Sequence, residues 1–266
     1  MGVINVTPDS FSDGGRFVNS EAAVAHALRM IEEGAGLIDV GGESTRPGAQ
    51  AVCAEEEIRR VVPVIEALAT RTKVPLSIDT SKPAVMTAAV RAGASMINDV
   101  RALREPGAIE AAARTDAAIC LMHMQGEPRT MQADPRYDDV VAEVRDFLRA
   151  RAEACLASGI ERTRLVIDPG IGFGKRLEHN LALLAGLPAL TSLGWPVLVG
   201  VSRKSMFGTL LGRAVDERVA GGVAVATAAV LAGASIVRTH DVAATVDAVK
   251  VAVALREAGK AVGCRL

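Results

Sequence analysis

The sequence predicts an α/β protein, a single (βα)8 TIM barrel, and three observations lead to this fold class. Eight short β-rich runs alternate with eight stretches of helical periodicity. The chain has 266 residues, close to the length of about 250 residues that such barrels need. No shift in composition divides it into two parts. A doubly wound open sheet is the weaker alternative.

The expected strands are short β-rich runs. In chain order they are GVINV (2–6), GLIDVG (36–41), PLSIDT (75–80), SMINDV (95–100), AAICLMH (117–123), RLVIDPG (164–170), PVLVGVS (196–202) and SIVRTH (235–240). The expected helices cover 20–33, 54–71, 83–92, 106–115, 138–158, 177–192, 216–232 and 242–258. Gly residues in AGAS, at 92–95 and 232–235, predict helix ends, and Pro83 and Pro106 suit first helical turns.

The composition favours small-molecule substrates as partners. Thirty basic and 31 acidic residues give a formal charge of −1, which argues against a nucleic acid or an anionic membrane as partner. The uncharged stretch 219–237 is mostly Ala, Gly and Val and is split by AGAS, so we expect no membrane span there. The start of the chain carries no targeting signal.

Four cysteines are scattered along the chain without a CxxC pair: Cys53, Cys120, Cys155 and Cys264. This spacing signals neither a zinc site nor a redox pair, and it predicts free thiols in a reducing cytoplasm.

Polar side chains gather at the carboxyl ends of the expected strands. They are Asn5, Asp39, Asp79, Asn98, His123, Asp168, Arg238 and His240, and Lys204 follows its strand closely. Helix capping can explain a single Asp or Asn at such a place, but it does not explain the whole set. In a barrel these strand ends share one rim, so the sequence predicts an active site there.

The residue types at this rim suit two kinds of group. Asp79 and Asp168 accept hydrogen bonds and Asn98 both donates and accepts, which suits a flat heterocycle whose edge carries ring NH and amino groups. Arg238 and His240 lie two positions apart, so they share a strand face and place two donors side by side for an anion.

Two long glycine-rich loops extend the rim. TPDSFSDGG (7–15) and GESTRPGAQ (42–50) predict mobile lids. Thr45 and Arg46 bring further donors, enough for a diphosphate, and Asn5 offers an oxygen to a bridging Mg²⁺.

Other readings of the same residues are weaker. A glycosidase pair of Asp79 and Asp168 conflicts with the aromatic content of 3% and with the neighbouring amide and lysine. A Schiff-base role for Lys204 conflicts with SRKS (202–205), which favours a polar clamp over a desolvated amine. DPGIGFGK (168–175) lacks the spacing of a nucleotide-binding loop. Met122 and Met124 share a face and predict core or pocket lining.

Taken together, eight strings in register resemble the dihydropteroate synthases over nearly the whole chain. They are MGVINVTPDSFSDGG, DVGGESTRPGA, SIDTSKP, INDV, LMHMQG, DPGIGFGK, SRKS and RTHDV. The resemblance implies one pterin-binding (βα)8 barrel domain over residues 1–266. It also implies a cytoplasmic transferase that joins 6-hydroxymethyl-7,8-dihydropterin diphosphate to p-aminobenzoate, releases diphosphate, uses Mg²⁺ and is a target of sulfonamides.

The resemblance also implies roles for individual residues. Those for the pterin are Asp79, Asn98, Met122, Asp168, Phe173 and Lys204. Those for the diphosphate are Asn5, Arg46, Arg238 and His240, with Asn5 and Asp13 near the metal. Those for p-aminobenzoate are Phe11, Thr45, Arg46, Pro47 and Ser205. The residues expected to act in catalysis are Asp79, Lys204, Arg238 and His240.

The implied reaction is dissociative, because diphosphate leaves before the aromatic amine attacks. The enzyme's task is then mostly electrostatic.

Family members are commonly homodimers, and an apolar stripe on the late helices is a candidate interface. They usually carry a short segment before the first strand, whereas this sequence starts at the strand, so we expect lower stability before lost activity.

Two other functions remain open from the sequence. One is a pterin-binding methyltransferase, which has little use for Arg238 beside His240. The other is a catalytically silent pterin-binding protein, which would not need Arg46 and Lys204.

Overall fold

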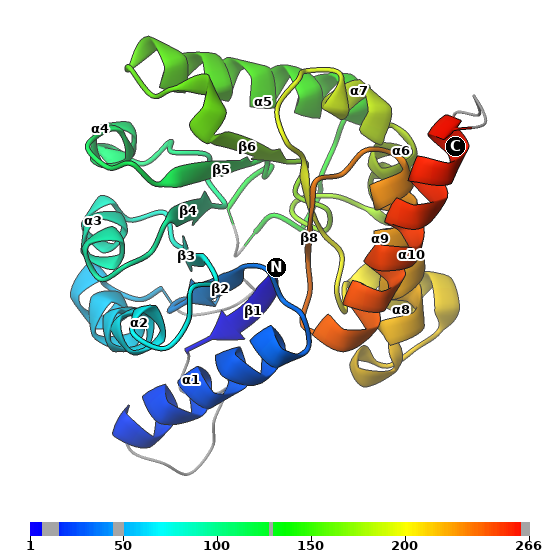
Figure 1. Cartoon of the computed structure of the whole chain (residues 1–266). Helices are drawn as coiled ribbons and strands as arrows, with labels where there is room; N and C mark the ends of the chain where they lie inside the picture. Colours follow the sequence, from blue (N-terminus) through cyan, green and yellow to red (C-terminus); the bar gives the residue numbers. More distant parts are fainter. Residues whose placement is uncertain (7–15, 45–50, 128–129, 262–266) are drawn as a thin grey trace.

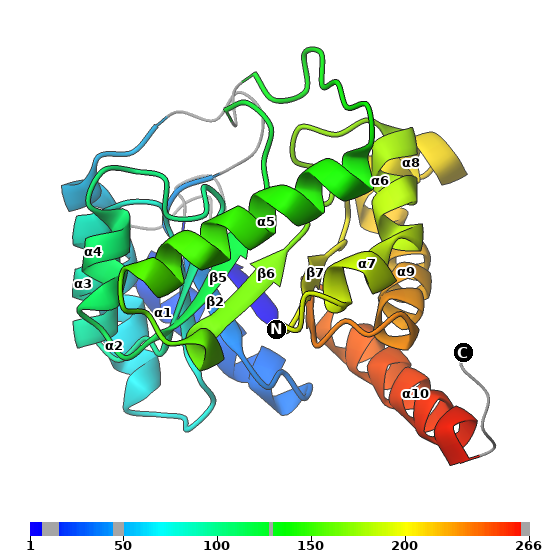
Figure 2. The same ribbon diagram turned by 90° about the horizontal axis from the view of Figure 1, so that it is seen from above.

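The computed structural model describes residues 1–6, 16–44, 51–127 and 130–261, with the backbone alone at 16–19. Figure 1 shows the strands at the centre and the helices around them, and Figure 2 shows the same arrangement from above. The strands are β1 Gly2–Asn5, β2 Ile38–Gly41, β3 Leu76–Asp79, β4 Met96–Asp99, β5 Ala118–Met122, β6 Leu165–Asp168, β7 Leu198–Gly200 and β8 Ile236–Arg238. All eight lie inside the ranges expected from the sequence.

The helices lie between and after these strands. They are α1 Arg16–Glu32, α2 Ala54–Ala69, α3 Pro83–Arg91, α4 Ala108–Ala113, α5 Val140–Ala157, α6 Leu177–Ala185, α7 Leu187–Thr191, α8 Ser205–Leu211, α9 Val219–Leu231 and α10 Val242–Ala261, with short 3-10 turns η2 Arg162–Arg164 and η3 Val215–Glu217.

The strands are parallel and follow one another in chain order. β1 to β6 form one sheet and β7 with β8 forms a second. Isolated parallel bridges join the two sheets at both seams, Ile167 with Val197 and Gly2 with Thr239. At the second seam, the Val3 amide donates to the Thr239 carbonyl at 3.1 Å. The eight strands therefore form a ring, as a TIM barrel requires.

Alternate residues of each strand belong to different clusters. Ile38, Val40 and Ile78 belong to the large core between strands and helices. A second, smaller cluster contains Met96 and Cys120 and fills the ring. Because side chains alternate along a strand, Asn98 and Asp39 lie on the inner face of the ring with that second cluster. The strand periodicity thus places polar groups above an apolar floor.

Two helix predictions needed correction. The expected helix 177–192 is divided at Gly186, because Pro188 lacks the N–H that would bond back to the preceding turn. A Cβ on Gly186 would also lie 2.8 Å from Cγ2 of Val141. The sequence reading missed α8, which has only seven residues and includes Gly208, too few for a periodicity to show.

Within the part of the chain that the structure describes, no helix combines the length and hydrophobicity needed to cross a membrane. The stretch 219–237 is divided between α9 and β8, as the AGAS signal predicts.

Candidate active site

A guanidinium and two carboxylates meet at the mouth of the ring. Arg238, the last residue of β8, donates from Nε to Oδ2 of Asp39 at 2.7 Å and from Nη2 to Oδ2 of Asp79 at 2.8 Å. Asn98 donates from Nδ2 to the same Oδ2 of Asp39 at 3.0 Å. Four strands therefore contribute to one polar network, and it contains three of the residues predicted for the site.

Burial sets the electrostatics of this network. Desolvation raises the pKa of Asp79 to about 7, although Arg238 acts in the opposite direction, and the charge of Asp39 adds to the rise. Burial also lowers the pKa of Arg238, but Asp39 and Asp79 outweigh it and the net shift is upward. Arg238 therefore stays charged, whereas Asp79 exchanges its proton near neutral pH.

Asn5, at the end of β1, lies across Gly41 from Asp79, because both residues pair with Gly41 in the sheet. A Cβ placed on Gly41 would lie 3.8 Å from Oδ1 of Asn5 and 3.5 Å from Cβ of Asp79. Gly41 thus leaves open the space between the amide and the carboxylate.

Lys204 approaches the mouth from the other side. Its Nζ lies 4.2 Å from the centroid of the Phe173 ring, within cation–π range. The preceding residue, Arg203, has φ 57°, and its guanidinium donates to Asp241, which fixes the start of α8. Burial lowers the pKa of Lys204 to about 8, and Arg238 adds to this decrease. The sequence predicted that Lys204 in SRKS is part of a polar clamp and is not desolvated. The lowered pKa shows that its amine is desolvated, so this part of the prediction was wrong.

Asp168 adds a third carboxylate to the mouth and is 5% exposed. Its Oδ1 accepts the Gly170 amide at 2.7 Å, while burial raises its pKa to about 6. Lys204 lowers this pKa from across the mouth.

Met122 and Phe173 pack into one apolar cluster, together with Met124. The structure therefore brings together the two side chains predicted to lie against the pterin ring. It also confirms that Met122 and Met124 share an apolar lining.

A buried lysine fixes the loop that carries Phe173. Lys175 is 3% exposed and donates from Nζ to the carbonyls of Gly170 and Phe173, each at 3.0 Å. Its Nζ also lies 2.9 Å from Nδ1 of His123, whose pKa falls to about 3 through burial and then the Lys175 charge. A Cβ on Gly170 would lie 1.9 Å from the His123 carbonyl oxygen, so backbone packs directly on backbone here. His123 is therefore a neutral, buried support of the site.

His240 lies just beyond β8. Its ring Nδ1 is 3.2 Å from Oγ of Ser202, and its backbone amide donates to the same oxygen at 3.1 Å. Burial, followed by the Arg238 charge, lowers its pKa to about 4. At neutral pH His240 is uncharged and can contribute only one N–H to a ligand.

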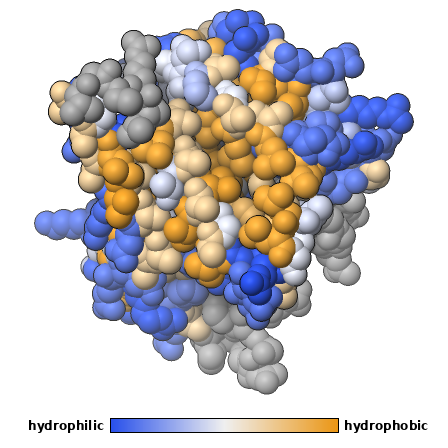
Figure 3. Space-filling model, turned by 90° about the vertical axis from the view of Figure 1, so that its right-hand side faces the viewer, coloured by the Kyte–Doolittle hydropathy of each residue, from blue (hydrophilic) through white to orange (hydrophobic). Residues whose placement is uncertain are grey.

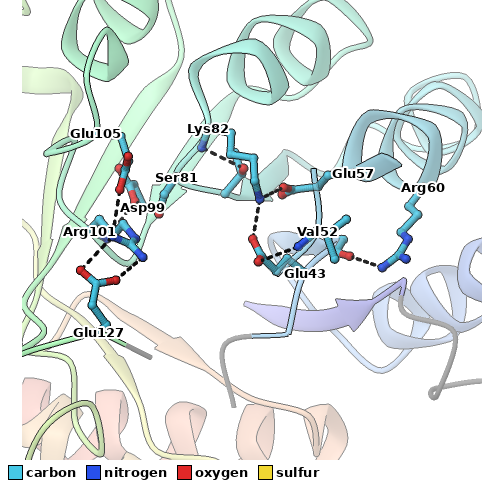
Figure 4. Close-up of polar contacts among 12 residues, drawn as sticks. Glu43, Val52, Glu57, Arg60, Ser81, Lys82, Asp99, Arg101, Glu105 and Glu127 are labelled. Carbon is cyan, nitrogen blue, oxygen red and sulfur yellow. Dashed lines mark hydrogen bonds and ion pairs between the residues drawn. The ribbon is translucent and has the colours of Figure 1, made fainter. Parts of the chain in front are cut away.

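A cavity of about 460 Å³ lies beside this mouth, and Asp79 is the only predicted site residue that lines it among those the structure describes. Figure 4 shows Lys82 between Glu43 and Glu57, with Nζ 2.5 Å from a carboxylate oxygen of each. In the same view Arg101 pairs with Glu105, at 2.8 Å, and with Glu127.

These ion pairs hold the connections that follow β2, β3 and β4. Oε1 of Glu43 accepts the Val52 amide at 3.1 Å, and Arg60 donates to the Gly42 carbonyl at 2.9 Å. Both ends of the connection from β2 to α2 are therefore anchored.

Several predicted site residues lie outside the described residues: Phe11, Asp13, Thr45, Arg46 and Pro47. The two glycine-rich loops predicted to be lids, 7–15 and 42–50, also lie mainly outside the described residues, so their role as lids stays a prediction. For Ser205 the structure gives its place as the first residue of α8.

Sequence reasoning missed the parts played by Glu57, Lys82 and Lys175. Lys82 belongs to SIDTSKP and Lys175 to DPGIGFGK, two of the strings that resemble the dihydropteroate synthases. Their place in these strings was the one sequence signal that could have indicated their importance. Glu57 is an ordinary helical glutamate in sequence, and its burial emerges only from packing.

No group of three or more His, Cys, Asp or Glu side chains within the described residues is arranged to hold a metal ion. Mg²⁺ is commonly held by one or two protein oxygens together with substrate phosphates. The amide oxygen of Asn5, which faces the space above Gly41, fits that type of site.

Comparison with known proteins gives a consistent result. The family described as "Pterin binding enzyme" matches residues 1–240. The dihydropteroate synthase of Escherichia coli K12 is 54% identical over 251 residues, covering 94% of this chain and 89% of that protein. The corresponding protein of Haemophilus influenzae is 51% identical and covers 94% of this chain and 91% of its own.

Solved structures agree in fold as well as in sequence. Dihydropteroate synthase from Yersinia pestis, in a sulfonamide drug complex, has a TM-score of 0.92 at 54% identity and covers 97% of this chain and 94% of its own. The Xanthomonas albilineans enzyme with 4-aminobenzoic acid has a TM-score of 0.91 at 58% identity, with coverage of 96% and 92%. The same enzyme in complex with 7,8-dihydropteroate has a TM-score of 0.88 at 55% identity, again covering 96% and 92%. This chain therefore belongs to the pterin-binding enzymes and, within them, to the dihydropteroate synthases.

Proposed function

We propose that this protein condenses 6-hydroxymethyl-7,8-dihydropterin diphosphate with p-aminobenzoate to give 7,8-dihydropteroate and diphosphate. The observation that carries the proposal is the mouth of the ring, where a charged Arg238 faces the carboxylates of Asp79 and Asp168 and where Lys204 lies over Phe173. Such a site offers acceptors for a heterocycle and a cation for a leaving anion.

The pterin occupies the carboxylate side in this proposal. Asp168 and Asp79 accept the ring NH and amino groups, Asn98 completes the edge, and Met122 with Phe173 forms the apolar wall. Asp168 and Asn98 are buried, which supports the assignment, because an acceptor in a low dielectric binds a donor more strongly than it would in water.

Arg238 and His240 bind the diphosphate. Arg238 uses Nε and Nη2 for Asp39 and Asp79, whereas Nη1 bonds to none of the described residues and is therefore available to the anion. When diphosphate leaves, positive charge develops on the exocyclic methylene. The carboxylates of Asp79 and Asp168 stabilise that charge, while Arg238 stabilises the departing anion.

p-Aminobenzoate then attacks the methylene through its amine. Ser205, the first residue of α8, forms the described part of its pocket, and Phe11, Thr45, Arg46 and Pro47 complete it from the two loops. Binding of sulfonamides in the same place follows from this assignment.

Mg²⁺ belongs to the diphosphate side of the site. The Asn5 amide oxygen would hold it together with diphosphate oxygens, and Asp13 would assist. The ion would supply further positive charge to the leaving group.

A homodimer fits the distribution of apolar surface. Six large apolar side chains of the described residues are 40% to 58% exposed: Leu181, Leu210, Leu211, Val215, Val251 and Leu255. They lie on α6, α8, η3 and α10, and Figure 3 shows a broad apolar area on this side of the molecule. A patch of this kind marks an interface. Val251→Glu should convert a dimer into a monomer in sedimentation, and an unchanged mass would contradict this surface.

Two further expectations stay proposals. One core cluster runs from Ile4 to Val242, which supports one barrel domain. Cys53, Cys120 and Cys155 are free thiols, which fits a cytoplasmic enzyme.

The decisive experiment incubates the protein with the pterin diphosphate, p-aminobenzoate and Mg²⁺ and detects 7,8-dihydropteroate by mass spectrometry. The Arg238→Ala variant and a reaction without p-aminobenzoate serve as controls. Absence of product with the unaltered protein would refute the proposal, and pterin binding without turnover would indicate a silent pterin-binding protein.

A further inference from the structure

Asp39 lies against two proposed site residues, Arg238 and Asn98, and is not itself one of the residues proposed to bind the substrates. It is the second residue of β2, its side chain is fully buried, and it faces the inside of the ring. Its carboxylate accepts hydrogen bonds from Arg238 of β8 and Asn98 of β4.

One oxygen of Asp39 makes both contacts. Oδ2 accepts from Nε of Arg238 at 2.7 Å and from Nδ2 of Asn98 at 3.0 Å. Oδ1, by contrast, has no hydrogen-bond partner among the described residues. A single oxygen of Asp39 therefore holds the side chains of both Arg238 and Asn98.

These contacts fix the orientation of both partners. Bonding at Nε sets the plane of the Arg238 guanidinium and turns Nη1 away from Asp39 and Asp79. Bonding from Nδ2 sets the amide of Asn98 so that its oxygen points elsewhere. The anion-binding group and the heterocycle-binding group are thereby held at a fixed separation.

We infer that Asp39 is a positioning residue, which sets Arg238 and Asn98 relative to one another for a ligand that carries both a heterocyclic edge and a diphosphate. The inference rests on the roles of Arg238 and Asn98 in the proposed function. Asp39 itself need not touch the substrate.

The test uses two substitutions that differ in what they keep. Asp39→Ala removes both hydrogen bonds. Asp39→Asn removes the charge but keeps an oxygen where Oδ2 lies, with the new NH₂ group at the unpartnered Oδ1 position. Ser77→Ala is the matched control, because Ser77 is the buried residue that pairs with Asp39 in the neighbouring strand.

Binding of the pterin diphosphate and of the pterin alcohol is measured by calorimetry, and KM for p-aminobenzoate is measured by turnover. We expect Asp39→Ala to weaken the pterin diphosphate by about tenfold or more, because two hydrogen bonds with a charged group are lost. The pterin alcohol should weaken by a smaller factor, through Asn98 alone. KM for p-aminobenzoate should stay within about twofold, and Asp39→Asn should bind both pterins within about threefold of the unaltered protein.

Repeating Asp39→Ala in an Arg238→Ala background separates the two contacts. If Asp39 acts through Arg238, the loss for the pterin diphosphate shrinks in that background to the loss seen for the pterin alcohol. If the full loss persists, Asp39 acts in another way and the inference is wrong.

Other results also overturn it. Unchanged affinity in Asp39→Ala, or equal damage from Asp39→Asn and Asp39→Ala, would show that Asp39 positions neither partner. If Arg238→Ala alone binds the pterin diphosphate normally, the proposed anion site and this inference both fail, whereas a loss in Arg238→Ala without one in Asp39→Ala refutes this inference alone. Circular dichroism melting checks that each variant folds. If Asp39→Ala does not fold, Asp39→Ser replaces it, because the serine side chain is too short to reach both partners. The losses expected for Asp39→Ala then apply to Asp39→Ser.

Discussion

Replacing Lys82 by Met should destabilise the fold through the carboxylate that it leaves behind. The Glu57 side chain is fully buried, and Lys82 is the cation that pairs with it, at 2.5 Å. Burial raises the pKa of Glu57, and the hydrogen bond from Lys82 opposes that rise. Glu43, the other partner of Lys82, is 29% exposed and can be hydrated instead.

The magnitude follows from the geometry of the pair. Removing one partner of a buried ion pair costs about 3–5 kcal/mol. Because Lys82 is 25% exposed, we expect the lower end, about 3 kcal/mol. At about 2–4 °C per kcal/mol for a chain of this size, the melting temperature should fall by roughly 6–12 °C.

The assay is urea unfolding followed by circular dichroism at pH 7 and pH 5. Lys82→Met should lose about 3 kcal/mol at pH 7. Adding Glu57→Gln should recover about 2 kcal/mol of that, because no unpaired charge is then buried. A raised pKa in the folded state means that the fold gains stability as Glu57 takes up its proton, so the deficit should shrink at pH 5.

Arg59→Met serves as the control, since it breaks an exposed pair with Glu56 on the same helix and should change stability by less than about 1 kcal/mol. The reasoning would be refuted if Lys82→Met behaved like Arg59→Met, or if Glu57→Gln failed to recover any stability.

Four further outcomes are expected. Arg238→Ala should weaken the pterin diphosphate by about 100-fold and the pterin alcohol far less, since only the former carries the anion; equal losses in calorimetry would contradict the anion site. Asp168→Asn should weaken the pterin alcohol by about tenfold or more, because an amide replaces a charged acceptor, and unchanged affinity would move the pterin elsewhere. The kcat/KM for the pterin diphosphate should fall as pH drops through about 7 and 6, where Asp79 and Asp168 take up protons, and again as pH rises through about 8, where Lys204 loses its charge; a flat pH profile would contradict these assignments. A sulfonamide should raise KM for p-aminobenzoate and leave kcat unchanged, whereas a lowered kcat at saturating p-aminobenzoate would place the drug outside that pocket.

The fold could be predicted well from the sequence, because hydrophobic periodicity and the Gly and Pro residues at element ends indicate the order of strands and helices. All eight strands were found, since most of them are short runs with β-branched residues that alternate with helical stretches. The seven-residue helix α8 and the break at Gly186 escaped, because the first is too short to show a period and the second depends on Pro188.

The site was predicted less completely than the fold. Residue type and position at strand ends indicated Asp79, Asn98 and Arg238 together, and these do meet. What these side chains contact could not be read from the sequence, because contacts between β2 and β8 join residues 199 positions apart. The desolvation of Lys204 likewise follows from packing around the mouth and not from its neighbours in the chain.

The backbone contact between the loops after β5 and β6 limits how this region can evolve. At Gly170 a methyl group would overlap the His123 carbonyl, and at Gly174 it would lie 2.3 Å from the Gln125 carbonyl. A variant that evades an inhibitor by reshaping this wall would have to separate two main chains and release the ammonium of Lys175. An inhibitor that rests against Met122 and Phe173 would therefore meet a surface with few tolerated alternatives.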